Sequence, residues 1–222
     1  MYIKKAEFST SLAAADPFMS DGTMEIAVVG KSNVGKSSLI NALGRNQKLA
    51  RTSSEPGKTR LINLFKFFTQ DDEEFILVDL PGYGFARVSR DEKARWQGMI
   101  EGYLSASEDL KHVLALVDIR HEPSSDDRTM IEYLRHYGIE FTVVATKSDK
   151  LSRAQISRSV QAICRALQVQ PWEVIPVSAQ SRQGLDKLCD RIGEIISQPD
   201  VDAPAFESDT ADGDFLSETD DQ

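Results

Sequence analysis

A nine-residue segment, Gly30–Ser38 (GKSNVGKSS), constrains this chain more than any other feature. The apolar run Ile26–Val29 precedes it, and Leu39–Leu43 follows with apolar residues at helical spacing. A G-x4-G-K-S loop between a strand and a helix points its backbone N–H groups and the positive end of the helix dipole at phosphate oxygens. Lys36 would reach the β- and γ-phosphates, and the Ser37 hydroxyl would ligate Mg²⁺. The segment therefore predicts a phosphate-binding loop rather than a chance turn.

Charge is distributed unevenly along the 222 residues, whose formal net charge is −9. Residues 197–222 hold nine acidic residues and no lysine or arginine, which leaves 26 acidic and 26 basic residues in residues 1–196. A tail rich in Asp, Ser, Ala and Thr has few large apolar side chains to bury, so we expect it to be disordered. We therefore expect a loosely held arm over 1–23 that could include one edge strand, a folded domain over 24–196, and the acidic tail over 197–222.

The apolar pattern disfavours membrane and secreted classes of protein. No apolar run approaches the ~20 residues that a membrane helix needs, and the N-terminal stretch lacks the unbroken apolar segment of a secretion signal. Cys164 and Cys189 fall on the apolar faces of predicted helices, where core thiols in a reducing cytoplasm explain them better than a disulfide or metal site. His112, His121 and His136 show no metal spacing. We expect a cytoplasmic monomer without a membrane partner.

Short apolar runs, each followed by turn or helix signals, are typical of parallel strands covered on both faces. The runs are 26–29, 75–78, 113–117, 141–145 and 174–177. Residues 61–68 mix in polar side chains and pair most simply as an antiparallel edge strand with 75–79. Amphipathic stretches predict helices near 90–105, 125–137, 156–167 and 185–195. We therefore expect an α/β fold with a mostly parallel six-stranded sheet, one antiparallel edge strand and helices on both faces. Its ligand site would lie at the carboxyl ends of the strands.

The segment Asp79–Gly82 (DLPG) ends one of these runs, 43 residues after Lys36. A carboxylate at that place can hold Mg²⁺ through its water, and the Gly82 N–H can reach a γ-phosphate. A D-x-x-G pattern alone arises freely in turns. At the end of a buried strand downstream of a phosphate-binding loop, it indicates nucleotide binding.

The segment Thr146–Asp149 (TKSD) directly follows the run 141–145. The two oxygens of Asp149 match the ring N–H and exocyclic amine that guanine presents side by side and adenine lacks, and such sites can discriminate by ~10⁴–10⁵. The stem of Lys147 can lie along the base while its ammonium reaches the phosphate loop. A helix N-cap with a surface lysine is the alternative. The backbone of Val177–Ala179 could contact the guanine carbonyl.

A long polar loop over 45–60 (RNQKLARTSSEPGKTR) connects the first predicted helix to the edge strand. Loops of this length without secondary structure of their own are usually functional. Pro56 and Gly57 would turn its end sharply, so that Lys58 and Thr59 face the nucleotide. A Thr59 hydroxyl there could complete the Mg²⁺ shell only when a γ-phosphate is present. We therefore predict that this loop is a switch.

The order and spacing of these segments over residues 25–196 resemble the translation-factor-related P-loop GTPases. The segments Gly30–Asn41, Pro56–Arg60, Asp79–Gly84 and Thr146–Asp149 are similar to those of the EngB family of ribosome-biogenesis GTPases. The resemblance implies a three-layer P-loop GTPase fold and hydrolysis of GTP to GDP with Mg²⁺. It also implies a role in assembling the large ribosomal subunit from rRNA and ribosomal proteins, and a link to normal cell division and septation.

The predicted site residues come from these segments. The nucleotide contacts are Gly30, Lys31, Ser32, Asn33, Val34, Gly35, Lys36, Ser37, Ser38, Gly57, Lys58, Thr59, Arg60, Leu61, Asp79, Leu80, Pro81, Gly82, Thr146, Lys147, Ser148, Asp149, Val177, Ser178 and Ala179. The predicted metal ligands are Ser37, Thr59 and Asp79. The predicted catalytic residues are Lys36, Thr59, Gly82 and Asn33.

One position departs from the usual catalytic pattern. Ras-like GTPases place a glutamine directly after the D-x-x-G glycine to orient the attacking water. Here that position is Tyr83, so we expect slow intrinsic hydrolysis, with the water positioned by backbone groups, another loop or a partner. In related GTPases without the glutamine, an asparagine at the position of Asn33 helps to hold K⁺ between the phosphates. K⁺ use is therefore one hypothesis, and a purely loop-capping role of Asn33 is the other.

Three function classes stay open from the sequence. The first is a regulatory GTPase whose GTP state binds a ribosomal precursor and whose GDP state releases it. The second is a P-loop phosphotransferase acting on a small nucleotide, which would need a lid domain and would leave Thr146–Asp149 unexplained. The third is a non-hydrolysing GTP- or GDP-binding module, which Tyr83 keeps open.

Overall fold

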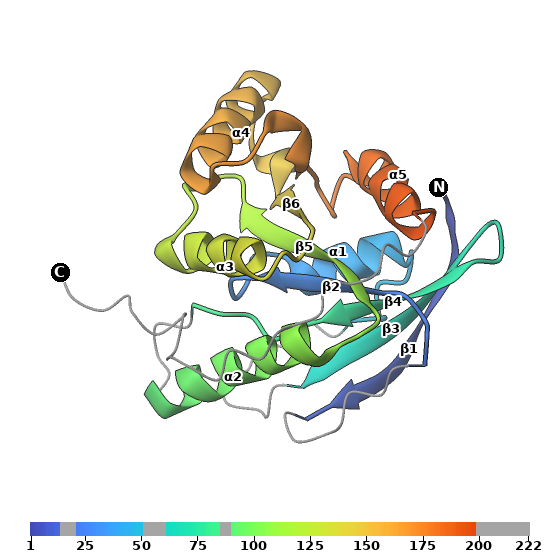
Figure 1. Cartoon of the computed structure of the whole chain (residues 1–222). Helices are drawn as coiled ribbons and strands as arrows, with labels where there is room; N and C mark the ends of the chain where they lie inside the picture. The colour runs from blue at the N-terminus through green and yellow to red at the C-terminus, as the bar shows by residue number, and fades with distance from the viewer. Residues whose placement is uncertain (14–20, 51–60, 85–89, 199–222) are drawn as a thin grey trace.

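The structure is a computed structural model that describes residues 1–13, 21–50, 61–84 and 90–198, with side chains described for all of these except 90–97. Strands and helices alternate along most of the chain (Figure 1). The strands are β1 (Ile3–Leu12), β2 (Glu25–Gly30), β3 (Ile62–Thr69), β4 (Glu74–Asp79), β5 (Leu110–Asp118), β6 (Phe141–Thr146) and β7 (Val174–Pro176). The helices are α1 (Lys36–Leu43), α2 (Arg90–Ala106), α3 (Ser125–His136), α4 (Arg153–Leu167) and α5 (Leu185–Ile196), with short 3-10 turns η1 (Ser148–Lys150) and η2 (Pro171–Glu173).

The strands form one sheet in the order β1-β3-β4-β2-β5-β6-β7. The pairs among β4, β2, β5, β6 and β7 are parallel, and the pairs β1–β3 and β3–β4 are antiparallel. The carboxyl ends of β2, β4, β5 and β6 therefore share one edge of the sheet, which is where the polar segments of the sequence follow the strands.

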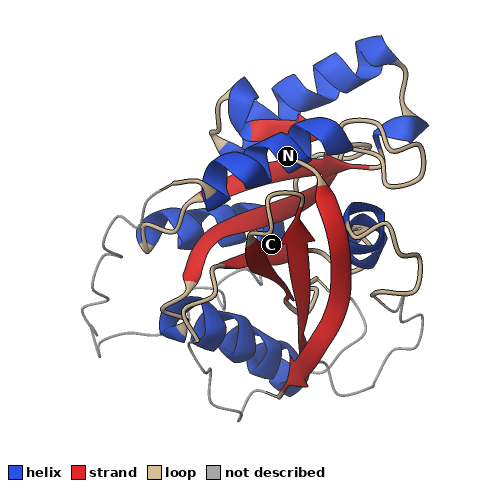
Figure 2. Cartoon of the chain, turned by 90° about the vertical axis from the view of Figure 1, so that its right-hand side faces the viewer, coloured by secondary structure: helices blue, strands red, loops and turns tan. Residues whose placement is uncertain are grey.

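Side chains of the central strands alternate between the two faces of the sheet. Helices cover both faces (Figures 1 and 2). Ala27 and Val29 of β2 belong to a core with α2, α3 and α4, whereas Ile26 and Val28 belong to a core with α1 and α5. Both faces of β2 are buried, which explains its unbroken apolar sequence. The predicted fold class, α/β with helices on both faces of a mostly parallel sheet, is confirmed.

The N-terminal segment corrects two details of the sequence-based expectation. Residues Ile3–Leu12 form an edge strand, as the sequence left open for the N-terminal arm, and pair with β3. The sheet therefore has seven strands rather than six, and β3 is an inner strand rather than the antiparallel edge. Most of β1 is exposed, and register shifts interrupt its pairing at two places. It therefore lacks the alternating apolar pattern that identifies a half-buried strand. The backbone amine of Met1 also donates a hydrogen bond to Asp190 Oδ1 of α5, at 2.8 Å.

Candidate nucleotide-binding site

The turn between β2 and α1 is shaped by residues with positive φ. Gly30 ends β2 with φ 156°, and a Cβ there would lie 2.9 Å from the backbone oxygen of Leu116 on the neighbouring strand β5. Asn33 has φ 62°, and Gly35 has φ 116° directly before Lys36 starts α1. Non-glycine residues seldom adopt φ values of this kind, and asparagine tolerates them better than most. The G-x4-G-K-S segment thus curls into the strand–loop–helix geometry that the sequence predicts.

The D-x-x-G aspartate ends the strand beside this loop. Asp79 lies opposite Val28 in the parallel pair β2–β4, and its Oδ1 is 4.0 Å from Lys36 Nζ. Burial raises the pKa of the Asp79 carboxyl above its usual range, while Lys36 and a hydrogen bond with Asn63 act in the opposite direction. Asp79 Oδ1 is buried and has no hydrogen-bond partner among the described residues. A buried carboxylate oxygen of this kind fits a hard cation such as Mg²⁺, and Ser37 stands in the first turn of α1, directly after Lys36.

The glycine and the tyrosine that follow contact the phosphate loop directly. A Cβ on Gly82 would lie 3.1 Å from Lys36 Nζ and 3.2 Å from the backbone of Ser32, so a side chain there would have to push the phosphate loop aside by a few tenths of an ångström. The carbonyl oxygen of Tyr83 accepts hydrogen bonds from Ser32 N at 2.9 Å and Ser32 Oγ at 3.1 Å. Lys31 and Tyr83 form an isolated parallel β-bridge. Two segments that are about 50 residues apart in the chain are therefore joined by one main-chain hydrogen bond and one from the Ser32 hydroxyl.

The segment after β6 is tied to the same loop. Thr146 Oγ1 donates to the carbonyl oxygen of Val34 at 2.7 Å, and Lys147 Nζ donates to that of Asn33 at 2.8 Å. Lys147 has φ 62°, which lets its side chain turn back over the phosphate loop. The predicted approach of the Lys147 ammonium to the loop is thus present in the structure.

The carboxylate of Asp149 is held by two donors. Ser178 Oγ donates to Asp149 Oδ1 at 2.7 Å, and Lys150 Nζ lies 3.0 Å from Oδ2. Ser178 and then Lys150 lower the pKa of Asp149, so the group is ionised and able to accept from two N–H donors. The N-cap alternative is wrong, because Ser152 caps α4 in a capping box with Gln155. Backbone hydrogen bonds from Val177 N to Ala145 O and from Ser148 N to Val177 O place 177–179 beside this segment.

Asp118 is a site residue that the sequence reasoning missed. It ends β5, and its carboxylate contacts Lys147 Nζ at 2.9 Å and Arg120 Nε and Nη2 at 2.9 and 2.7 Å. Burial opposes ionisation, but the hydrogen bonds from Arg120 and Lys147 outweigh it and lower the pKa of Asp118 below its usual range. Its place at the carboxyl end of a central strand was the available signal.

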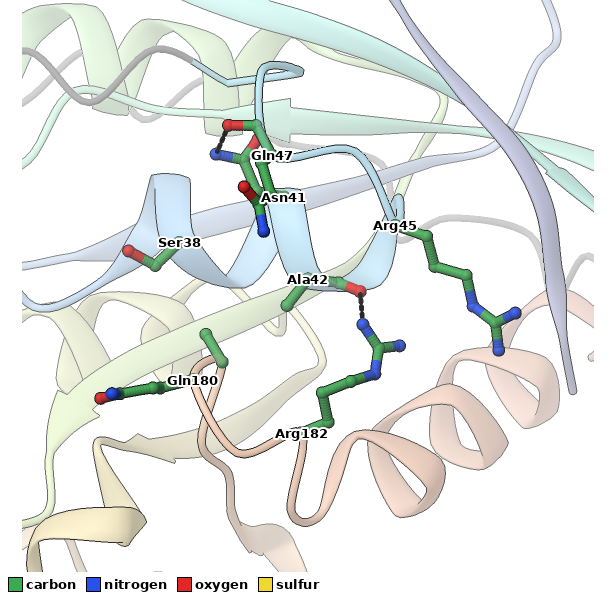
Figure 3. Close-up of a pocket in the computed structure, with 8 residues that line it drawn as sticks. Ser38, Asn41, Ala42, Arg45, Gln47, Gln180 and Arg182 are labelled. Atoms are coloured by element: carbon green, nitrogen blue, oxygen red, sulfur yellow. Dashed lines mark hydrogen bonds between the residues drawn. The ribbon is translucent and has the colours of Figure 1, made fainter.

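Residues 51–60 of the predicted switch loop lie outside the described residues, and they include Pro56, Gly57, Lys58, Thr59 and Arg60. Leu61 directly precedes β3. The preceding segment is anchored by Asn41 of α1. Asn41 Oδ1 accepts from Ala50 N at 2.7 Å, and Asn41 Nδ2 donates to the carbonyl oxygen of Ala50 at 3.0 Å. Asn41 Nδ2 also donates to the carbonyl oxygen of Gln47 at 3.2 Å (Figure 3). The side chain of Asn41 therefore sets where the loop leaves α1.

A hollow of about 570 Å³ lies beside α1 (Figure 3). Its lining includes Ser38, Ala179 and Gln180, and it also includes Arg182, whose Nη1 donates to Ala42 O at 3.2 Å. A second cavity of about 330 Å³ lies between the phosphate loop and residues 117–124, and Asp127 and Lys147 line it as well. The predicted nucleotide residues thus border open space on both sides of the loop.

The described residues contain no group of three or more His, Cys, Asp or Glu side chains that could hold a metal ion. They also contain no helix that is long and apolar enough to cross a membrane. Cys164 and Cys189 are free thiols, and both are partly buried.

Comparison with known proteins identifies similar sequences over most of the chain. The profile of the family described as 50S ribosome-binding GTPase matches residues 25–147, and that of the elongation factor Tu GTP binding domain matches residues 97–198. A probable GTP-binding protein EngB of Clostridioides difficile (strain 630) is 43% identical over 193 residues, which cover 86% of this chain and 93% of that protein. The protein of the same name from Clostridium perfringens (strain SM101 / Type A) is 47% identical over 191 residues, with 86% and 95% covered.

A solved structure agrees with the sequence comparison. The crystal structure of a probable GTP-binding protein engB superposes with a TM-score of 0.63 at 25% identity, covering 78% of this chain and 98% of that chain. The similarity therefore extends from the sequence to the arrangement of the strands and helices.

Proposed function

Because the chain belongs to the EngB family of GTP-binding proteins, which are P-loop GTPases, we propose that it is a nucleotide-dependent switch in assembly of the large ribosomal subunit. The chain binds and hydrolyses GTP, as its family does. In the proposal, the GTP-bound state binds a precursor made of rRNA and ribosomal proteins, and the GDP-bound state releases it. The match to a family described as ribosome-binding supports this role. A cytoplasmic monomer needed for normal cell division and septation completes the proposal.

Guanine selection rests on the ionised carboxylate of Asp149. Ser178 Oγ fixes Oδ1 at 2.7 Å, so the carboxylate is oriented before the base arrives. Lys147 also contributes to the proposed base site, because its ammonium donates to the carbonyl oxygen of Asn33 and so fixes the side chain against the phosphate loop. An oriented acceptor pair penalises a base without matching donors, because such a base cannot satisfy the acceptor positions that the carboxylate keeps beside its bonds to Ser178 and Lys150. The Ser178–Asp149 hydrogen bond is the observation that carries the proposal of a guanine-specific switch.

The γ-phosphate would be read by the residues around Lys36. We place Mg²⁺ near Ser37 and Asp79, with Thr59 as the ligand that depends on the γ-phosphate. Ser37, Asp79 and Thr59 would hold the ion, which would neutralise negative charge that develops during phosphoryl transfer. Lys36 supplies a further positive charge, and the Gly82 peptide lies against it. The chain's own part is therefore to hold the phosphates in position and to stabilise the developing charge.

Slow intrinsic hydrolysis follows from the side chain after the D-x-x-G glycine. Tyr83 Oη donates to Asp127 Oδ1 at 2.9 Å, so this side chain is bonded to α3. A phenol in that place does not orient water as an amide does. We propose that backbone groups, another loop, a partner or K⁺ near Asn33 supplies the missing function. The phosphotransferase alternative gains no support from these contacts, and membership of a GTPase family disfavours the non-hydrolysing alternative.

Co-sedimentation with isolated bacterial ribosomal subunits tests the proposal. We expect the protein with a non-hydrolysable GTP analogue to sediment with the large subunit, and the protein with GDP to stay in the supernatant. An Asp149→Asn variant provides the matched control, because it should sediment only with the xanthosine analogue. Equal sedimentation with both nucleotides would contradict the switch, and sedimentation with the small subunit alone would contradict the proposed partner.

A further inference from the structure

Tyr83 connects two parts of the fold through two different groups. Its carbonyl oxygen accepts from Ser32 in the phosphate loop, and its hydroxyl donates to Asp127 Oδ1 in the first turn of α3 at 2.9 Å. Its ring packs against the core that α2, α3 and α4 cover. The backbone of Tyr83 is therefore bonded to the phosphate loop, and its side chain is bonded to α3.

The carboxylate of Asp127 is shared between a helix cap and this tyrosine. Asp127 Oδ2 accepts from Ser124 N and Ser124 Oγ, both at 2.8 Å, and Asp127 N donates to Ser124 Oγ at 3.3 Å. These contacts form the capping box that starts α3. The box leaves Oδ1 for Tyr83. Asp127 is 7% exposed, so the tyrosine hydroxyl satisfies a carboxylate oxygen with little access to water.

The direction of this hydrogen bond is fixed by its surroundings. Burial raises the pKa of Tyr83 well above its usual value, and the neighbouring Asp127 charge adds to the effect. The phenol therefore keeps its proton and is the donor. A donor to a buried carboxylate makes one of the stronger hydrogen bonds in proteins.

The glycines on both sides of Tyr83 pack closely against neighbouring residues. Gly82 lies against Lys36 and Ser32, and Gly84, with φ +75°, would place a Cβ 2.8 Å from Lys31 Cε and 3.0 Å from Asp126 Oδ2. The D-x-x-G loop is therefore held between the phosphate loop and the first turn of α3, with Tyr83 bonded to both.

We propose that Tyr83 and Asp127 are positioning residues that hold the D-x-x-G loop in the geometry that reads the γ-phosphate. The inference rests on the proposed role of Asp79 and Gly82 at that phosphate. Without the hydroxyl–carboxylate bond, part of the free energy of γ-phosphate binding is spent on ordering the loop. GDP is held by the phosphate loop and by Asp149, which this bond does not touch. The pair should therefore set the preference between GTP and GDP.

The Tyr83→Phe variant tests this, because it keeps the ring and removes only the hydroxyl. We expect the ratio of Kd for a non-hydrolysable GTP analogue to Kd for GDP, measured with fluorescent nucleotides, to rise about three- to tenfold. The turnover number at saturating GTP should fall by a similar factor. Asp127→Asn should act in the same direction, and the double variant should fall short of the product of the single effects.

Tyr103→Phe is the matched control. Tyr103 Oη donates to Glu25 Oε2 at 2.6 Å, which is the same kind of buried tyrosine–carboxylate bond. Glu25 starts β2, whereas the phosphate loop follows the other end of that strand. This variant should lower the melting temperature and leave the Kd ratio unchanged. Equal losses of GTP and GDP affinity in Tyr83→Phe, or no loss of either, would overturn the proposal.

Asp79→Asn separates a failure of this inference from a failure of the proposed site. If Asp79→Asn changes the Kd ratio and Tyr83→Phe does not, the loop reads the γ-phosphate without help from Tyr83, and only the positioning role is wrong. If neither variant changes the ratio, the assignment of the D-x-x-G loop to the γ-phosphate fails as well.

Discussion

Lys147 Nζ donates a 2.8 Å hydrogen bond to the carbonyl oxygen of Asn33, which lies 114 residues earlier in the chain. The bond joins the segment that we assign to the base with the loop that we assign to the phosphates. Asp118 holds the same ammonium at 2.9 Å from the carboxyl end of β5. The Lys147 side chain therefore links the base side of the site to the phosphate side.

Replacing Asp118 with asparagine should weaken binding of both GTP and GDP. The Lys147 side chain is 29% exposed, and it would lose its charged partner and the orientation that this partner imposes. We expect Kd to rise about tenfold for both nucleotides, as for the loss of ~1.4 kcal/mol, with the ratio of the two unchanged. Isothermal titration measures both constants. Arg120→Gln is the control, since it keeps the Asp118–Lys147 contact and should change Kd much less; an effect as large as that of Asp118→Asn would contradict the argument.

Replacing Asp149 with asparagine should shift the preference from guanine to xanthine nucleotides. The amide offers a donor where the carboxylate offers only acceptors, and xanthine has a carbonyl where guanine has its exocyclic amine. Competition between GDP and XDP for the bound fluorescent nucleotide measures the shift, and unchanged GDP affinity would refute guanine recognition by this residue.

Ser178→Ala is the matched variant for this prediction. It removes the hydroxyl that orients Asp149 Oδ1 at 2.7 Å but leaves the carboxylate in place. It should weaken GDP binding without creating affinity for XDP. Gain of xanthine binding in Ser178→Ala would mean that the selectivity depends on something other than the carboxylate.

The central sheet could be predicted from the sequence because its strands are buried on both faces. The apolar runs at 26–29 and 113–117 fall inside β2 and β5, and their burial leaves no polar positions to confuse the pattern. β1 could not be predicted in the same way. Phe8 is 52% exposed and packs edge-on against Phe65, so this strand depends on pairing with β3 rather than on a buried face of its own.

The phosphate loop and its neighbours were predictable because fixed spacing carries their chemistry. The contacts made by Asp118 and Asp127 were not, since each depends on strand order and on how α3 begins. The sequence does indicate that Ser124–Asp127 can start a helix. It does not indicate that the second oxygen of Asp127 meets Tyr83, because the two residues are 44 positions apart and belong to different elements.

The buried His112 should make stability depend on pH. Its Nε2 lies 2.9 Å from Thr142 Oγ1, and burial, followed by the charge of Arg191, lowers its pKa to about 3. In the unfolded chain His112 binds a proton below pH ~6.5, whereas in the folded protein it stays neutral until a much lower pH. The neutral His112 therefore contributes to the free energy of unfolding above pH ~6.5, and this contribution is lost as the pH falls. The loss for this one group amounts to ~2 kcal/mol between pH 7.5 and 5.

Urea unfolding of wild type and His112→Gln at those two pH values measures this effect. The difference between their free energies of unfolding should be smaller at pH 5 than at pH 7.5, because only the wild type takes up a proton on His112 when it unfolds. His121→Gln is the control, since it also removes one imidazole but at an exposed position, whereas His112 is buried. A difference that stays constant for His112→Gln would show that His112 is not held neutral.

The two hypotheses for Asn33 can be separated by a glycine. The structure gives Asn33 φ 62°, a conformation that asparagine tolerates and glycine adopts freely, so loop geometry alone can account for the residue. Asn33→Gly keeps that backbone and the carbonyl that accepts from Lys147, and it removes only the side-chain amide.

If the amide helps to hold K⁺, the wild type should hydrolyse GTP several-fold faster in KCl than in NaCl at equal ionic strength. Asn33→Gly should lose that preference whatever its rate in NaCl. Equal wild-type rates in the two salts would rule out K⁺ use, and a K⁺ preference that persists in Asn33→Gly would assign the ion to other groups and leave Asn33 with the loop-capping role.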